Sequence, residues 1–360
     1  MTKTSKHNSA LEEKDGSPPQ ESLSKIVAAK LKKNRKNTPS TQQLIEGIQA
    51  GNITALSRAI TIIESKASKH QQQAHDIIEA CLPHANNSIR IGITGVPGVG
   101  KSTFIESFGQ LLTSKNHKVA VLAVDPSSGI SKGSILGDKT RMDDLVKDPN
   151  AFIRPSASGD SLGGVARKTR EAIILCEAAG YDIIIIETVG VGQSETVVHS
   201  MTDFFLLLKL AGAGDELQGI KRGIMEMADV IAINKADGEN VKAAKLAKAE
   251  FNRALHLYPV KDSGWMAKTV TCSAIENEGI NTVWELISEY FNLVKGNSTF
   301  QIKRDKQHEF WLLQTIEFRL KSDFYNQESV KKELKKQLQL LSKNKTTPFV
   351  AANLLLKLKS

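Results

Sequence analysis

The stretch Gly95–Ser102 constrains this chain of 360 residues more than any other, because it reads G-V-P-G-V-G-K-S. This sequence matches the phosphate-binding motif G-x-x-x-x-G-K-[ST]. A short apolar run at Ile89–Ile93 precedes it, and apolar residues recur at helical spacing over Phe104–Leu112 after it. The pattern therefore predicts a strand, a glycine loop and a helix that together bind the phosphates of a nucleoside triphosphate.

Each residue type in the loop has a chemical reason. Glycines let the backbone turn where a Cβ would clash, so that successive N–H groups point at phosphate oxygens. Lys101 is expected to neutralise the β- and γ-phosphates, and the Ser102 hydroxyl is expected to ligand Mg²⁺. The other residues expected to contact the nucleotide here are Gly95, Val96, Pro97, Gly98, Val99, Gly100 and Thr103.

Short apolar runs alternate with helical patterns from residue 89 to residue 294. This alternation predicts an α/β fold, a mostly parallel sheet with helices on both faces, and ligand binding at the carboxyl ends of the strands. The expected strands are Ile89–Ile93, Val119–Val124, Phe152–Arg154, Ile183–Glu187, Phe204–Leu208, Val230–Asn234 and Thr269–Cys272. The expected helices are Ser102–Ser114, Gly164–Ala179, Gly219–Ala228, Val241–Ala254 and Thr282–Val294.

The two ends of the chain have other patterns. Residues 1–38 form a polar tail that we expect to be disordered, and residues 39–88 form a helical N-terminal domain in which Asn52 caps the second helix. The nucleotide-binding domain is expected over 89–295 and a helical C-terminal region over 296–360. The apolar stripes of that last region either pack on a core of their own or form a dimerisation arm. Their members are Phe310, Leu313, Ile316 and Leu320, then Val330, Leu334, Leu338 and Leu341.

Acidic side chains follow two of the expected strands. Asp125 comes directly after one strand, and Glu187 ends the fully apolar run Ile183–Ile186. A buried acid at a strand tip is costly unless it is paired or faces an ion, so we expect both, with Asp138, near Mg²⁺. Gln193 is expected to orient the water that attacks the γ-phosphate. A turn-forming role for Asp125, an ordinary surface position for Asp138 and a solvated loop position for Gln193 remain open alternatives.

A second glycine-rich stretch, Gly212–Lys221, opens a helix. The amino-acid sequence of this stretch by itself indicates only a turn and the start of a helix. Gln218 and Lys221 are the polar side chains in it that could reach a phosphate across an interface.

The tetrapeptide Asn234-Lys235-Ala236-Asp237 ends a later strand and matches N-K-x-D, which reads guanine. The Asp237 carboxylate can accept both N1–H and the exocyclic N2–H of guanine, whereas adenine offers neither there. Asn234 can bond neighbouring loops and the base, and the Lys235 stem can stack on it. Ser273 and Ala274, after the last strand, can supply a backbone N–H for guanine O6. We therefore expect GTP or GDP as the ligand.

Composition limits the other classes of function. The net charge is +9, but much of the excess lies in the first forty residues and after Lys303, without the aromatic and basic interleaving of RNA-binding surfaces. Cys81, Cys176 and Cys272 are scattered singly, which fits core packing in a reducing compartment. No apolar run is long enough to span a bilayer, and the stretch Met1–Asn37 lacks the apolar segment expected of a secretory signal. We expect a cytoplasmic protein with neither nucleic acid nor membrane as a partner.

With these residues in place, the chain resembles the methylmalonyl-CoA mutase-associated GTP-binding proteins, once labelled as an arginine-transport kinase. The resemblance covers about residues 40–295. The segments that match are G-V-P-G-V-G-K-S-T, V-D-P-S-S, G-S-I-L-G-D-K-T-R-M, F-I-R-P-S, L-G-G-V-A-R-K-T-R-E, E-T-V-G-V-G-Q-S-E, G-A-G-D-E-L-Q-G-I-K-R-G-I-M-E-M-A-D and N-K-A-D.

The resemblance implies a homodimeric P-loop GTPase of the signal-recognition-particle and hydrogenase-chaperone class. Such proteins guard an adenosylcobalamin-dependent mutase, gate delivery of its cofactor and help to eject damaged cofactor. It further implies that Asp138 lies in a first switch, Gln193 in a second, and Gln218 with Lys221 in a third that responds to the mutase. Residues with a role in hydrolysis are then Lys101, Asp138, Glu187, Gln193, Gln218 and Lys221.

Two other functions fit the same loop. A kinase of this fold would need an acceptor pocket and a base near the γ-phosphate, and the sequence shows no obvious pocket. A metal-insertion chaperone would be expected to carry a cluster of histidines or cysteines, whereas the eight histidines of this chain are dispersed.

Overall fold

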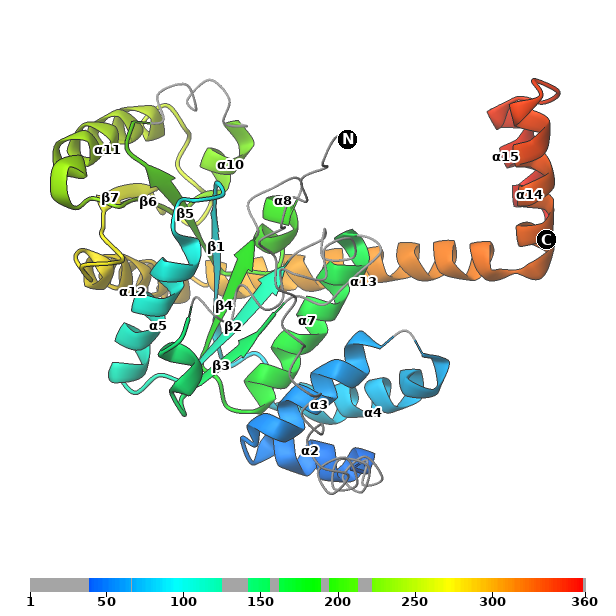
Figure 1. Ribbon diagram of the computed structural model, residues 1–360, viewed down its shortest axis with the longest axis horizontal. Helices are drawn as coiled ribbons and strands as arrows, with labels where there is room; N and C mark the ends of the chain where they lie inside the picture. Colours follow the sequence, from blue (N-terminus) through cyan, green and yellow to red (C-terminus); the bar gives the residue numbers. More distant parts are fainter. Residues whose placement is uncertain are drawn as a thin grey trace, which may run out of the picture. The chain divides into compact units, whose positions relative to one another are not determined.

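The computed structural model describes most of the chain from residue 39 onward (Figure 1). The polar tail over 1–38 lies outside the described residues, so its expected disorder stays a prediction. All elements below belong to Thr41–Ser360, which forms one compact unit. Across the described residues, no helix is both long and apolar enough to cross a membrane. The described ranges are 39–65, 67–124, 142–155, 162–188, 194–212 and 222–358.

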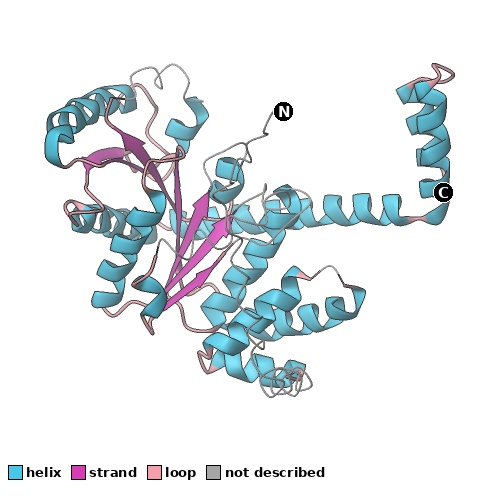
Figure 2. Cartoon of the chain, in the orientation of Figure 1, coloured by secondary structure: helices cyan, strands magenta, loops and turns pink. Residues whose placement is uncertain are grey.

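The centre of the fold is a parallel sheet of seven strands (Figure 2). Their order across the sheet is β3-β2-β4-β1-β5-β6-β7, and every pairing of neighbours is parallel. The seven strands predicted from apolar runs are confirmed, with ends that differ by two residues at most. They are β1 (Ile89–Gly95), β2 (Val119–Val124), β3 (Ala151–Arg154), β4 (Ile183–Thr188), β5 (Phe204–Leu210), β6 (Val230–Asn234) and β7 (Lys268–Thr271).

The alternation of side chains along β4 shows why its sequence is continuously apolar. Ile183 and Ile185 enter a core on one face of the sheet, which is completed by α5 (Lys101–Ser114) and α12 (Ile280–Gly296). Ile184 and Ile186 enter a second core on the other face, which is completed by α7 (Leu162–Ala178). Both faces are covered, so neither set of side chains reaches water.

The helices around the sheet follow the predicted periodicity, although α8, of six residues, was not predicted. A helix this short spans fewer than two turns and carries too little pattern to be recognised. The helices are α5 (Lys101–Ser114), α7 (Leu162–Ala178), α8 (Ser194–His199), α10 (Arg222–Met227), α11 (Val241–Leu255) and α12 (Ile280–Gly296). Single 3₁₀ turns occur at Ser68–His70, Leu82–His84, Leu145–Lys147 and Gly238–Asn240.

Three helices precede the sheet, as expected: α2 (Thr41–Gln49), α3 (Ile53–Glu64) and α4 (Gln71–Cys81). Asn52 is the N-cap of α3, and its Oδ1 accepts a hydrogen bond from Ala55 N at 3.0 Å. The apolar faces of these helices join the same core as α7 and one face of the sheet.

Three helices also follow the sheet: α13 (Thr299–Asn326), α14 (Glu328–Ser342) and α15 (Pro348–Lys357). The stripe predicted on α13 is exposed, with Phe310, Leu313, Ile316 and Leu320 between 43% and 54% accessible. This stripe therefore does not pack on a core of its own within one chain. In α14 the stripe is divided, because Val330 is buried while Leu338 is exposed.

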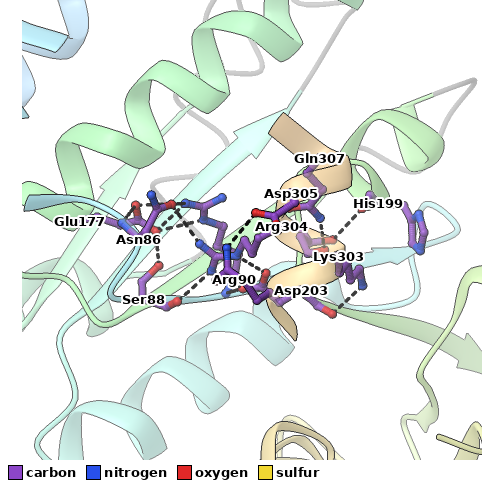
Figure 3. Close-up of polar contacts among 12 residues, drawn as sticks. Asn86, Ser88, Arg90, Glu177, His199, Asp203, Lys303, Arg304, Asp305 and Gln307 are labelled. Atoms are coloured by element: carbon purple, nitrogen blue, oxygen red, sulfur yellow. Dashed lines mark hydrogen bonds and ion pairs between the residues drawn. The ribbon is translucent and has the colours of Figure 1, made fainter. Parts of the chain in front are cut away.

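A buried polar network attaches the start of α13 to the amino edge of the sheet (Figure 3). Arg304 donates from Nε and Nη2 to the two carboxylate oxygens of Asp203, both at 2.6 Å. Asp203 Oδ2 also accepts Arg90 N at 2.8 Å, and the Arg90 guanidinium binds Glu177 on α7. Arg304 and Asp203 are 3% and 1% exposed, so the charges compensate one another away from water.

Candidate functional site

The loop between β1 and α5 has the backbone that its glycines predicted. Gly95, Gly98 and Gly100 have φ of 155°, 81° and 91°, values that residues with a Cβ rarely adopt. Space is a second constraint at two of them. A Cβ on Gly95 would lie 2.7 Å from the Leu208 carbonyl oxygen, and one on Gly100 would lie 2.8 Å from Asn234 Nδ2. Only glycine therefore fits the start and the end of the loop.

Lys101 begins α5 and its ammonium bends back into the loop. Its Nζ donates to the Gly95 carbonyl at 2.8 Å and to the Val96 carbonyl at 3.3 Å. The side chain is only 8% exposed. A buried cation beside a turn of glycine amides and a helix N-terminus is suited to bind phosphate oxygens. Val99 anchors the loop in the core, while Pro97 and Thr103 are exposed and Ser102 is half-buried.

Glu187 lies near the carboxyl end of β4, the strand that neighbours β1. It is 8% exposed and sits in register with Ile93 on β1 and Ala123 on β2. One residue further on, the Thr188 hydroxyl is hydrogen-bonded to the Thr94 hydroxyl at 2.8 Å, which joins the two strand ends. The predicted position of this acid, at a strand tip beside the loop, is confirmed.

The residues present fit a magnesium ion. Mg²⁺ prefers oxygen ligands, and Ser102 at the first turn of α5 offers a hydroxyl while Glu187 offers a carboxylate at the adjacent strand end. A buried carboxylate is also stabilised by a nearby cation. The other predicted metal residues, Asp125 and Asp138, lie outside the described residues, as do Gln193, Gln218 and Lys221.

Asn234, at the end of β6, connects the predicted base-reading motif to the phosphate loop. It is 1% exposed, and its Nδ2 donates to the Val99 carbonyl at 2.9 Å. Its Oδ1 accepts the backbone N–H of Ala274 at 3.2 Å. One amide side chain thereby fixes the distance between the loop that would hold the phosphates and the two loops that would hold the base.

Asp237 and Ser273 meet beside this junction. The Ser273 hydroxyl donates a hydrogen bond to Asp237 Oδ2 at 2.6 Å. This bond fixes the orientation of the carboxylate. Lys235, two residues before Asp237, has φ of 57° and is half-buried. The structure therefore brings together the residues predicted to read the base, although they come from two loops nearly forty residues apart.

Ala274 has a role in the structure that its sequence did not indicate. Its N–H donates to Asn234, and its carbonyl accepts the Ser107 hydroxyl of α5 at 2.5 Å. It therefore positions the base-reading loop against the helix of the phosphate loop, and its predicted contact with guanine O6 stays a prediction. The available signal for Ser107 was its place on the buried face of α5, between the apolar residues Phe104 and Phe108, where a hydroxyl needs a partner.

Comparison with known proteins identifies the family. The family model described as "Methylmalonyl Co-A mutase-associated GTPase MeaB" matches residues 56–329. "GTPase ArgK" of Escherichia coli is 42% identical over 312 residues, which is 87% of this chain and 94% of that protein. The mouse protein "Methylmalonic aciduria type A homolog, mitochondrial" is 41% identical over 346 residues, which is 92% of this chain and 83% of that protein.

A solved structure agrees with these relatives. It is described as "Crystal structure of LAO/AO transport system kinase" and superposes with a TM-score of 0.70 at 36% identity, covering 88% of this chain and 97% of that chain. Its fold confirms the P-loop architecture with C-terminal helices. The family implies guanine-nucleotide binding, in agreement with the N-K-x-D motif at the end of β6. This chain belongs to the methylmalonyl-CoA mutase-associated GTPase family.

Proposed function

We propose that this protein binds and hydrolyses GTP and acts as a chaperone of an adenosylcobalamin-dependent acyl-CoA mutase, protecting the mutase and gating the loading of its cofactor. The observation that carries the nucleotide part is the bond between Asn234 and the Val99 carbonyl. It supports the proposal because it joins the end of β6, where the expected base-reading motif begins, to the expected phosphate loop at the same edge of the sheet. The family and the mouse relative's name support methylmalonyl-CoA mutase as the partner.

In this proposal the nucleotide is bound at two ends. Lys101 and the amides of Gly95–Ser102 hold the phosphates, and Thr103 lies on the same first turn of α5. Asp237 accepts the two N–H groups that distinguish guanine from adenine, while Lys235 covers the base. Ser273 holds the Asp237 carboxylate in place, since its hydroxyl is already hydrogen-bonded to Oδ2.

Magnesium would be held by the Ser102 hydroxyl and by Glu187, with Asp125 and Asp138 completing the oxygen ligands. When bound, the ion neutralises charge that develops on the phosphate oxygens. Around it, we assign Gln193 to orient the attacking water and Gln218 with Lys221 to respond to the mutase. Lys101, Asp138 and Glu187 complete the group of residues assigned to hydrolysis.

The exposed stripe on α13 supports a homodimer. Phe310, Leu313, Ile316 and Leu320 leave a row of apolar side chains accessible on a helix of 28 residues. Burial of such a row against its own copy would remove apolar surface from water.

GTP radiolabelled on its γ-phosphate tests the function directly. We expect slow release of labelled inorganic phosphate, changed by purified methylmalonyl-CoA mutase, and absent in Lys101→Ala. The mutase is expected to change nucleotide affinity as well, by linkage. Label transferred to an acceptor instead of water would show a kinase. A mutase that altered neither turnover nor affinity would contradict the proposed partnership while leaving GTP hydrolysis intact.

A further inference from the structure

The loop between β7 and α12 is a turn whose backbone is held at both ends. Ser273 and Glu278 pair as an antiparallel bridge, with N to O distances of 2.9 Å and 3.1 Å in the two directions. Gly279 closes the turn with φ of 71°, and a Cβ there would lie 2.4 Å from the Thr271 carbonyl oxygen. The directions of the amide and carbonyl groups inside the loop are therefore set by the fold.

Four of the five amides from residue 272 to residue 276 donate to acceptors within the protein. Ile275 N–H is the fifth, and no residue that the structure describes accepts a hydrogen bond from it. Each amide carries a single proton, so the engaged amides have none left for a ligand. The engaged pairs are Cys272 N with Ile233 O (2.9 Å), Ser273 N with Glu278 O (2.9 Å), Ala274 N with Asn234 Oδ1 (3.2 Å) and Glu276 N with Ser273 Oγ (3.2 Å).

Ser107 of α5 fixes the direction in which the amide of Ile275 points. Its hydroxyl donates to the Ala274 carbonyl at 2.5 Å, and Ser107 is only 8% exposed. That carbonyl and the Ile275 N–H belong to one planar trans peptide group, in which C=O and N–H point in opposite directions. Because the carbonyl is turned toward α5, the N–H is turned away from the helix, on the side where Ile275 is exposed.

This loop also lies beside the carboxylate that is expected to read the base. Ser273 Oγ donates to Asp237 Oδ2 at 2.6 Å, and Ile275 follows two residues later. Guanine carries O6, N1–H and N2–H side by side on one edge, so a donor to O6 has to lie next to the acceptor of the two N–H groups. Among the five amides, Ile275 N–H is the one with a proton to donate.

We propose that the Ile275 N–H donates to O6 of the bound guanine and that Ser107 is the positioning residue that orients it. This inference rests on the proposed GTP-binding function. It assigns the O6 contact to a residue other than Ser273 and Ala274, whose amides hold the loop together. Adenine carries an amino group at position 6, which is itself a donor, so the amide of Ile275 rejects adenine independently of Asp237.

6-Thio-GDP tests the contact, because it differs from GDP in one atom: sulfur, a weak hydrogen-bond acceptor, replaces O6. In calorimetric titration of the full-length protein, we expect GDP to bind at least about fivefold more tightly than 6-thio-GDP. In Ser107→Ala the peptide between Ala274 and Ile275 loses its constraint, so the GDP affinity should fall by about fivefold while the 6-thio-GDP affinity stays nearly the same. The ratio of the two affinities then approaches one, which general destabilisation of the fold would not produce.

Two substitutions of Ile275 separate its amide from its side chain. Ile275→Pro removes the N–H and should abolish the preference for GDP over 6-thio-GDP, whereas Ile275→Ala keeps the N–H and should retain it. Ser114→Ala, at an exposed serine of α5, is the matched control for Ser107→Ala and should also retain the preference.

The outcomes that overturn the inference differ from those that overturn the proposed function. Equal affinity of the unmodified protein for GDP and 6-thio-GDP would show that O6 has no donor. An unchanged preference in Ser107→Ala would overturn the inference even if Ile275→Pro does not fold. Failure of the unmodified protein to bind GDP at all would instead contradict the proposed function.

Discussion

Asn234 on β6 donates a hydrogen bond of 2.9 Å to the carbonyl of Val99 in the phosphate loop, across 135 positions of sequence. The same side chain accepts from Ala274 on its other side. Since the amide is 1% exposed, its partners have no water to replace it. The two halves of the proposed nucleotide site are therefore joined through one buried residue.

Replacing Asn234 with Ala should damage the site and the fold together. Val99 O and Ala274 N would each lose a buried partner, at a cost of about 1–3 kcal/mol per group. We expect a lower melting temperature and at least about tenfold weaker binding of both GDP and GTP, measured by thermal denaturation and calorimetry. The control is Asn240→Ala, an exposed asparagine close by in sequence. Nucleotide affinity equal to that of the control would show that this bond does not organise the site.

Replacing Asp237 with Asn should change which base is preferred. The amide can donate to the C2 carbonyl of xanthine but cannot accept both N–H groups of guanine. We expect weaker GTP binding, by about 1–3 kcal/mol or more, and a gain in affinity for xanthosine triphosphate. Competition of the two nucleotides for the variant measures the shift. Unchanged affinity for GTP would remove Asp237 from base reading.

Arg304→Met should destabilise the whole protein. It leaves the Asp203 carboxylate, 1% exposed, without its two-point partner, and breaking a buried ion pair on one side costs about 3–5 kcal/mol. Urea denaturation measures the loss. The double variant Arg304→Met with Asp203→Asn should recover part of it, because the unpaired charge is then absent. Lys321→Met, on the exposed part of α13, is the control and should leave the midpoint unchanged.

His199 should make the protein less stable in mild acid. Burial, with Lys303 nearby, lowers its pKa from 6.5 to about 4 in the folded chain, so the unfolded chain binds the proton more readily. The stabilisation is complete above pH 6.5 and is lost as the pH falls toward 4, by at most about 3 kcal/mol. His199→Phe, which keeps an aromatic ring against Phe205, should flatten the slope of unfolding free energy against pH in this window. The same change at exposed His84 should leave the slope as it was.

Ile316→Asp should weaken self-association if the α13 stripe forms a dimer interface. Ile316 is 46% exposed in one chain, so the substitution places a charge at the proposed interface without altering the core. Sedimentation velocity across a concentration series should show a larger monomer fraction. Lys321→Asp introduces the same carboxylate at another exposed position of the helix and tests for a general charge effect. Equal dimer fractions in both variants and the unmodified protein would rule out this face.

The sequence by itself determined the features that depend on neighbouring residues. The apolar runs placed all seven strands, the glycines fixed the backbone of the phosphate loop, and Asn52 capped its helix as expected. These signals are local, because strand burial, positive φ and helix capping act over a few residues. The N-K-x-D motif likewise needed no tertiary information to indicate guanine.

Only the tertiary structure decided which distant residues meet. Arg90 stands alone as a charge within an apolar strand, and nothing near it in sequence identifies Glu177 as its partner. The pairing of Asp203 with Arg304, the bond from Asn234 to Val99 and the bond from Ser107 to Ala274 also depend on the order of strands in the sheet. Side chains brought together by that order carry no shared spacing in the sequence, so their contacts follow from the packing of the sheet and its helices.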